Sequence, residues 1–145
     1  MIKGLDYTGV SCVCICRDGK GKFLLLQRGP KARDEQGAWE FGGGTLEFGE
    51  TLEECVRRER KEEINAELTN LELVHAATIV RQEGSLNNHW VILLWAADVV
   101  NIGELRIMEP EHITEIGWFT KGELPDPPHT ALHSFVELAG RKGII

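Results

Sequence analysis

The chain has 145 residues, 42% hydrophobic and 27% charged, which is typical of a globular protein with one core of ordinary size. Its formal net charge is −7, so neither nucleic acid nor an anionic membrane is expected as its main partner, although local arginines or a bound cation can still admit a small polyphosphate. Residues 1–10 lack the apolar run of a signal peptide, and no later stretch could span a bilayer. We therefore expect a single domain over residues 1–145, located in the cytoplasm.

Two strands are predicted near the start of the chain, at 10–16 and 23–27, with a turn between them. The first is apolar on both faces apart from Ser11, as expected for an interior strand. Three cysteines alternate along it: Cys12, Cys14 and Cys16. Residues two apart on a strand lie about 6.5 Å apart with parallel side chains, which suits neither a disulfide nor three ligands on one ion. We therefore interpret the cysteines as small core residues in a reducing compartment.

The later elements are predicted from hydrophobic periodicity and from helix and turn signals. In chain order they are a short strand at 39–41, a helix at 51–64, long strands at 71–81 and 89–100 joined by a loop at 82–88, a short strand at 114–119, and a helix at 127–140. A capping box of Thr51 and Glu54 fixes the start of the first helix. The second helix has prolines at its start and a glycine at its end, which mark its two limits. Strands dominate, so the predicted fold class is α+β with a mixed sheet.

The helix at 51–64 carries acids on the face that is apolar one turn earlier. At about 100° per residue, Glu59, Glu62 and Glu63 continue that apolar stripe, whereas a solvated charge run should lie opposite it. Like charges four residues apart destabilise a helix by about 0.2–0.5 kcal/mol per pair when exposed, and a partly buried cluster costs far more unless it is paired or bound to a cation. A hard divalent ion with oxygen ligands removes this cost, and magnesium is the natural choice.

Three consecutive glycines, 42–44, precede this helix by one short loop. Without side chains they allow close approach of the backbone and offer carbonyl oxygens, although a simple turn would explain the run alone. Joined to the acidic helix, the run becomes part of a specific pattern.

From Gly44 the sequence reads G-x5-E-x7-R-E through Glu50, Arg58 and Glu59, and continues to the acid pair at 62–63. This spacing resembles the Nudix box, G-x5-E-x7-R-E-U-x-E-E-x-G-U, in which U is a bulky aliphatic residue. The flanking "WEFGGG" and the late "EIGWFTKGELP" are also similar to that family, so the resemblance covers most of the chain. It implies the Nudix fold, an α/β/α sandwich around a mixed β-sheet, and divalent-cation-dependent hydrolysis of a nucleoside diphosphate linked to another group.

Four positions depart from the family pattern. Arg60 stands where an aliphatic residue is usual, and Gly42 takes a place often held by proline. Asn65 replaces the box glycine and Ala66 its last aliphatic residue. Asparagine tolerates the left-handed conformation that follows a helix. Arg60 flanks the buried stripe, from which its guanidinium could reach outward to water.

The resemblance implies a role for each residue that matches the box. Three acids would hold one to three Mg²⁺ ions, for which Mn²⁺ can substitute, together with the carbonyl of Gly43: Glu59, Glu62 and Glu63. The metal would neutralise the diphosphate and lower the pKa of an attacking water. Glu59 could be a ligand, the general base or both. Arg58 joins the catalytic set and pairs with Glu50 to brace the loop, which Gly44 also supports.

Residues outside the box are weaker candidates. Arg28 is a candidate phosphate contact or a structural salt bridge, and Trp90 could stack on a base or serve only in the core. The acids on the loop before the last strand are Glu109, Glu111 and Glu115. We choose Glu111 as an additional metal ligand, the alternative being that all three are merely exposed. His129 and His133 lie four apart on the last predicted helix, but nothing nearby completes a zinc site.

The marks of several substrate subclasses are absent, and "GGGTLEFGETLEEC" looks most like compact MutT-like enzymes that cleave nucleoside triphosphates. We therefore expect conversion of a nucleoside triphosphate to the monophosphate and pyrophosphate. A nucleotide sugar or another diphosphate, a non-catalytic nucleotide-binding module and an isomerase of a small diphosphate are the alternatives. The expected partner is a small nucleotide, without nucleic acid or membrane, and a homodimer stays open.

Overall fold

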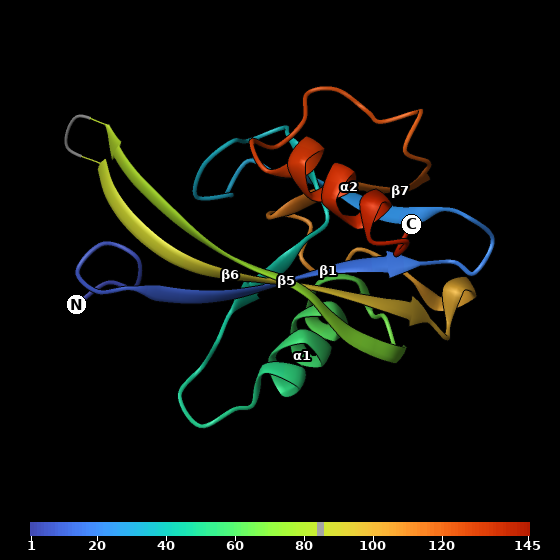
Figure 1. Cartoon of the computed structure of the whole chain (residues 1–145), viewed down its shortest axis with the longest axis horizontal. Coiled ribbons are helices and arrows are strands. Elements are labelled where there is room, and N and C mark those ends of the chain that lie inside the picture. Colours follow the sequence, from blue (N-terminus) through green and yellow to red (C-terminus); the bar gives the residue numbers. More distant parts are fainter. Residues whose placement is uncertain (84–85) are drawn as a thin grey trace.

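The computed structural model describes residues 1–83 and 86–145, which form one mixed sheet with a helix on each face (Figure 1). The elements follow in chain order as β1 (Gly9–Arg17), β2 (Phe23–Arg28), β3 (Trp39–Glu40), β4 (Gly43–Thr45), α1 (Leu52–Ile64), β5 (Leu68–Glu83), β6 (Leu86–Val99), the 3-10 helix η1 (Ile102–Glu104), β7 (Ile113–Phe119) and α2 (Leu132–Arg141). None of these helices is both long enough and apolar enough to cross a membrane.

The sheet has the order β3-β2-β1-β6-β5, with β4 paired to β1 and β7 paired to β2. β1 runs parallel to β6, and the other pairings are antiparallel. In Figure 1, α1 and α2 lie on opposite sides of this sheet, so the layers are α/β/α. The predicted α+β class and the sandwich around a mixed sheet are confirmed.

The central strand β1 is buried on both faces because its residues alternate between two cores. The three strand cysteines pack in the core under α1 with Val56 and Ile64. Ile15 points to the other face and packs with Leu132 and Val136 of α2. All four cysteines are free and buried, and the three on β1 are small core residues as predicted. The alternation therefore fixes the face of the sheet on which α1 must lie.

Both ends of α1 follow local rules that the sequence predicts. The Thr51 side chain accepts a hydrogen bond from the Glu54 N–H at 3.2 Å, and the Glu54 carboxylate accepts one from the Thr51 N–H at 3.1 Å. At the other end Asn65 is left-handed, with φ 59°, and its N–H donates to the Lys61 carbonyl at 3.0 Å. The helix is thus held in register with the loop that precedes it.

The elements differ from the sequence predictions mainly in three places. The glycine run, for which no strand was predicted, includes most of strand β4, because its backbone pairs with β1. The predicted loop at 82–88 is strand wherever it is described, since β5 and β6 stay paired to their ends; residues 84–85 lie outside the described residues. Helix α2 begins at Leu132 rather than at 127, because Pro127 and His129 share backbone hydrogen bonds with Trp39 of β3.

Candidate active site

The glycine strand β4 brings the loop before α1 against the centre of the sheet. Gly43 pairs with Val13, and a Cβ on Gly43 would clash with the Cys12 carbonyl. A Cβ on Gly44 would clash with the carboxyl group of Glu59. Only glycine therefore permits this approach, which seats Glu59 of α1 directly against the strand.

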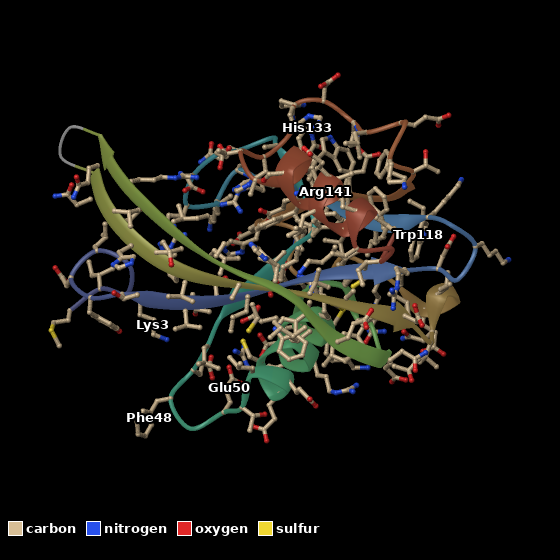
Figure 2. The ribbon with its side chains drawn as sticks, in the orientation of Figure 1. Lys3, Phe48, Glu50, Trp118, His133 and Arg141 are labelled. Atoms are coloured by element: carbon tan, nitrogen blue, oxygen red, sulfur yellow. The ribbon has the colours of Figure 1, made fainter. Side chains whose placement is uncertain are left out.

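Arg58 connects the loop to the acids of α1. Its guanidinium donates to both carboxylate oxygens of Glu50, at 2.9 and 2.6 Å, and to the Thr45 carbonyl at 3.1 Å. It also donates to Glu59 at 2.7 Å and to Glu62 at 3.3 Å. These contacts form the predicted Glu50–Arg58 brace, and the arginine hydrogen bonds lower the pKa of Glu50 to about 2. In Figure 2, Glu50 lies on the loop that leads into α1, with Phe48 pointing away from the protein.

The three box acids differ in exposure. The side chains of Glu59 and Glu63 are 15% and 12% exposed, whereas that of Glu62 is 53% exposed. Burial raises the pKa of Glu63 to about 8; Arg60 opposes this effect, and the carboxyl group of Glu59 adds to it. Glu63 therefore still favours an added cation, although it already has one cationic neighbour.

That neighbour, Arg60, does not reach outward to water. Its side chain is fully buried and donates to the Phe41 carbonyl at 3.1 Å and to Glu63 Oε1 at 2.7 Å. The space that it fills lies under Gly42, where an added Cβ would be 2.6 Å from both terminal nitrogens. The expected outward orientation is wrong, because Gly42 leaves room inside and Glu63 supplies an opposite charge there.

The acids of the box fit a divalent ion by chemistry, although they are drawn toward arginines here. Within 1–83 and 86–145, the one set of three acid or histidine side chains with ligand atoms within 4.8 Å of one another is Asp34, Glu35 and His129. Arg58 holds one oxygen each of Glu59 and Glu62, and Arg60 holds one of Glu63. The second oxygen of each acid accepts no hydrogen bond within the described chain. Hard oxygen donors remain for an ion such as Mg²⁺.

A cavity of about 200 Å³ lies beside the glycine strand, on the face of the sheet that α2 covers. Its apolar wall comes from the sheet and from α2, through Val13, Ile79, Trp90, Ile92, Leu132 and Phe135. Its polar wall comes from several segments and includes Arg28, Arg33, Asp34, Glu40, Arg81, Asn88 and His129. The cavity thus joins an apolar floor to groups that donate and accept hydrogen bonds.

Trp90 lines this cavity, but much of its ring serves packing. The ring is 6% exposed and lies against Gly4 and Gly9, where added Cβ atoms would clash with it. The guanidinium of Arg33 lies 4.8 Å from the ring centroid. Sequence reasoning missed Arg33, because the polar loop that carries it has no motif.

Arg28 also lines the cavity, but its donors are already used. It donates to Glu40 at 2.9 Å and to the Asp34 carboxylate and carbonyl, each at 2.8 Å. This is the structural salt bridge left open above, and its role as a phosphate contact stays a prediction. Glu40, which sequence reasoning missed, lies near enough to Glu63 to raise its pKa further. It therefore links the cavity wall to the box.

The remaining candidates lie apart from the box. The side chain of Glu111 is 63% exposed and pairs with Lys31 at 3.0 Å, so its role as a metal ligand stays a prediction. His129 precedes α2 and contacts Glu35 at 2.7 Å. His133 is exposed on α2 (Figure 2), and it does not belong to the acid and histidine set around His129. The zinc site considered on the last helix is therefore not formed, because within the described residues His129 groups with Asp34 and Glu35 rather than with His133.

The NUDIX domain family model matches residues 7–137. The NAD-capped RNA hydrolases NudC of Pseudomonas aeruginosa PAO1 and Vibrio vulnificus are 35% and 32% identical to the chain over 112 and 140 residues. These matches cover 75% and 92% of the chain but 36% and 48% of the relatives, so the chain spans less than half of their length.

Two solved structures of similar proteins align with this chain over nearly the whole length of both partners. The MutT NUDIX hydrolase from Burkholderia pseudomallei superposes with a TM-score of 0.80 at 28% identity, over 92% of this chain and 98% of that one. The MutT protein from Methanosarcina mazei Go1 gives a TM-score of 0.76 at 22% identity over 99% of each chain, and shows the fold alone.

Proposed function

Because the chain belongs to the Nudix hydrolase family, we propose that it is a Mg²⁺-dependent pyrophosphohydrolase that converts a nucleoside triphosphate to the monophosphate and pyrophosphate. The observation that carries this proposal is the seating of Glu59 against Gly44 while Arg58 ties that acid to Glu50. A non-catalytic module would need no such brace between the loop and a half-buried acid.

Glu59, Glu62, Glu63 and the Gly43 carbonyl would hold the ion, with Mn²⁺ as a substitute. When bound, it supplies charge neutralisation at the diphosphate and a more acidic water. Arg58 keeps one oxygen of Glu59 fixed, which leaves the other oriented as a ligand or as the acceptor of the water proton. Glu111 would become a further ligand only after release from Lys31.

The cavity supports a nucleotide as substrate. Its volume of about 200 Å³ falls below the roughly 300–1,000 Å³ of sites that enclose a whole drug-sized ligand. It therefore suits one part of the substrate, the base, with the phosphates outside over the glycine strand. Trp90 offers an aromatic edge to the base, and Arg33 is the cation best placed to turn toward a phosphate.

A second candidate substrate comes from the NudC relatives, whose name describes hydrolysis of NAD-capped RNA. The net charge of −7 disfavours an RNA backbone, so we propose a free nucleotide rather than nucleic acid as the partner, and no membrane. Four buried free cysteines support the cytoplasm as the compartment.

The test is product release from a substrate panel. Nucleoside and deoxynucleoside triphosphates, nucleotide sugars, NAD and NAD-capped RNA would each be incubated with Mg²⁺, and pyrophosphate, phosphate and mononucleotide would be measured. We expect pyrophosphate and monophosphate from a triphosphate. Cleavage of NAD or capped RNA alone would replace the triphosphate by the second candidate. Tight nucleotide binding without any product would identify a binding module.

A further inference from the structure

Arg60 is the one charged side chain that is buried in the part of the chain that the structure describes. It occupies a box position where the family pattern has an aliphatic residue. An arginine inside a core is strongly unfavourable unless an opposite charge and hydrogen bonds accompany it. Its presence therefore has to be explained by what surrounds it.

Its surroundings provide one anion and one carbonyl as hydrogen-bond acceptors, with the thiols of Cys14 and Cys16 nearby, in a space that exists because residue 42 is glycine. Nη2 contacts Glu63 Oε1 at 2.7 Å, and Nη1 donates to the Phe41 carbonyl at 3.1 Å. Gly42 leaves the room above both nitrogens that any Cβ would close. The two departures from the family pattern, Gly42 and Arg60, are thus complementary in space.

This arrangement places the positive charge of Arg60 in direct contact with the Glu63 carboxylate, which is a proposed metal ligand. An ion bound to Glu63 would share that carboxylate with the guanidinium, and two cations on one carboxylate repel each other. With no ion bound, the guanidinium is the cation that compensates the carboxylate. The same residue thus favours the metal-free site and opposes the loaded one.

We infer that Arg60 is a built-in counter-ion of Glu63, which stabilises the metal-free protein and weakens its affinity for Mg²⁺. The inference rests on the proposed function for the identity of Glu63 as a metal ligand. Arg60 is a positioning residue, because it acts on the site through Glu63. A purely structural role, through the Phe41 carbonyl alone, is the competing explanation.

The first experiment tests the coupling of Arg60 to Glu63 without metal or substrate. Melting temperatures would be measured in EDTA at about pH 9 for wild type, Arg60→Met, Glu63→Gln and the double variant. We expect Arg60→Met to lower the melting temperature clearly when Glu63 is present and much less when Gln replaces it. Equal losses in both backgrounds would assign Arg60 to packing and overturn the inference.

Lys61→Met is the matched control. Lys61 is the next residue on α1, and its exposed ammonium pairs with Glu67 at 3.3 Å. Its removal takes away the same charge, and we expect it to add independently to Glu63→Gln. If Arg60→Met does not fold alone but folds with Mg²⁺ or together with Glu63→Gln, the coupling is supported. Failure to fold under all three conditions would assign Arg60 to packing.

The second experiment measures Mg²⁺ affinity by calorimetry without nucleotide. Removing a unit charge a few Å from the ion should tighten binding by about tenfold in Arg60→Met, with no change in Lys61→Met. Unchanged or weaker binding in Arg60→Met would overturn the opposing role of Arg60. If wild type binds no Mg²⁺, the proposed metal site fails and the opposing role with it, while the experiment in EDTA still decides the role of Arg60 in the metal-free protein.

Discussion

The two faces of the sheet carry sites of different construction. On the α1 face, the box residues come from one continuous segment, 44–63. The helix and the loop before it fix the positions of these residues relative to one another. On the α2 face, the cavity wall combines a loop, a strand hairpin and the segment before α2, which are far apart in sequence. The first construction suits fixed chemistry, and the second allows the substrate to differ between proteins that share that chemistry.

Changes on the α1 face should therefore act on catalysis, and changes on the α2 face on substrate binding. The largest expected effect is removal of the divalent ion. Excess EDTA should abolish turnover and Mg²⁺ or Mn²⁺ should restore it, with rates rising toward alkaline pH because the ligands must be ionised. Turnover would be followed by pyrophosphate release across pH. Full activity in EDTA would contradict the metal mechanism and remove the distinction between the faces.

Glu59→Gln tests the α1 face by replacing one carboxylate oxygen with an amide nitrogen. We expect turnover to fall by a factor on the order of 10² or more with little change in KM, because in the proposed mechanism Glu59 acts on the reacting groups. Glu53→Gln is the matched control, since Glu53 is exposed in the first turn of the same helix. Steady-state kinetics of both variants, with melting temperatures, would check this. Equal activities would show that the Glu59 carboxylate takes no part in catalysis.

Arg33→Ala tests the α2 face. Arg33 has no ion pair within the described chain, and its guanidinium lies over Trp90 at the cavity. We expect KM to rise by about tenfold with kcat nearly unchanged, since the contact is made equally in ground and transition states. Lys20→Ala removes a distant exposed cation in the turn after β1 and should change neither constant. A fall in kcat without a change in KM would place Arg33 with the catalytic groups instead.

How far the sequence predicts each face follows from this difference in construction. The capping box of Thr51 and Glu54 and the left-handed Asn65 depend on neighbours within a few residues, and both were predicted. Strand β4 was missed because glycines become a strand here only through pairing with β1. The inward orientation of the Arg60 side chain depends on the space under Gly42, which forms only when the chain folds. Of the cavity wall, Arg28 and Trp90 were named as substrate-binding candidates, and the other members were missed in that role because they come together only after folding.

Glu63 gives the α1 face a pH-dependent stability. Its pKa is about 8 in the folded protein and near the ordinary value of 4.5 when unfolded, so folding favours the protonated form. Its stabilising contribution is complete below about pH 4.5 and is lost as the pH rises through about 8. In EDTA, the free energy of unfolding should therefore fall over this range, and Glu63→Gln should remove the fall.

The check is urea unfolding of wild type and Glu63→Gln in EDTA at several pH values. Mg²⁺ should restore part of the stability of wild type at alkaline pH, and it should do less for the variant, which is expected to bind the ion more weakly. A wild-type profile that is flat between pH 5 and 9 would mean that Glu63 is not buried as a carboxyl group. The pair with Arg60 would then need another explanation.

The smallest expected effect lies at the end of α1, where Asn65 replaces the glycine of the box. Its left-handed φ of 59° favours glycine, but its side chain also donates to the Glu104 carbonyl at 3.1 Å on the surface. The easier backbone conformation and the lost exposed hydrogen bond should nearly cancel in Asn65→Gly, leaving stability within about 0.5 kcal/mol of wild type. Asn65→Ala loses the hydrogen bond without gaining the easier backbone conformation, so it should lose about 1 kcal/mol of stability. A loss above about 1 kcal/mol in Asn65→Gly, measured by urea unfolding, would show that the contact with Glu104 rather than the backbone conformation selects asparagine here.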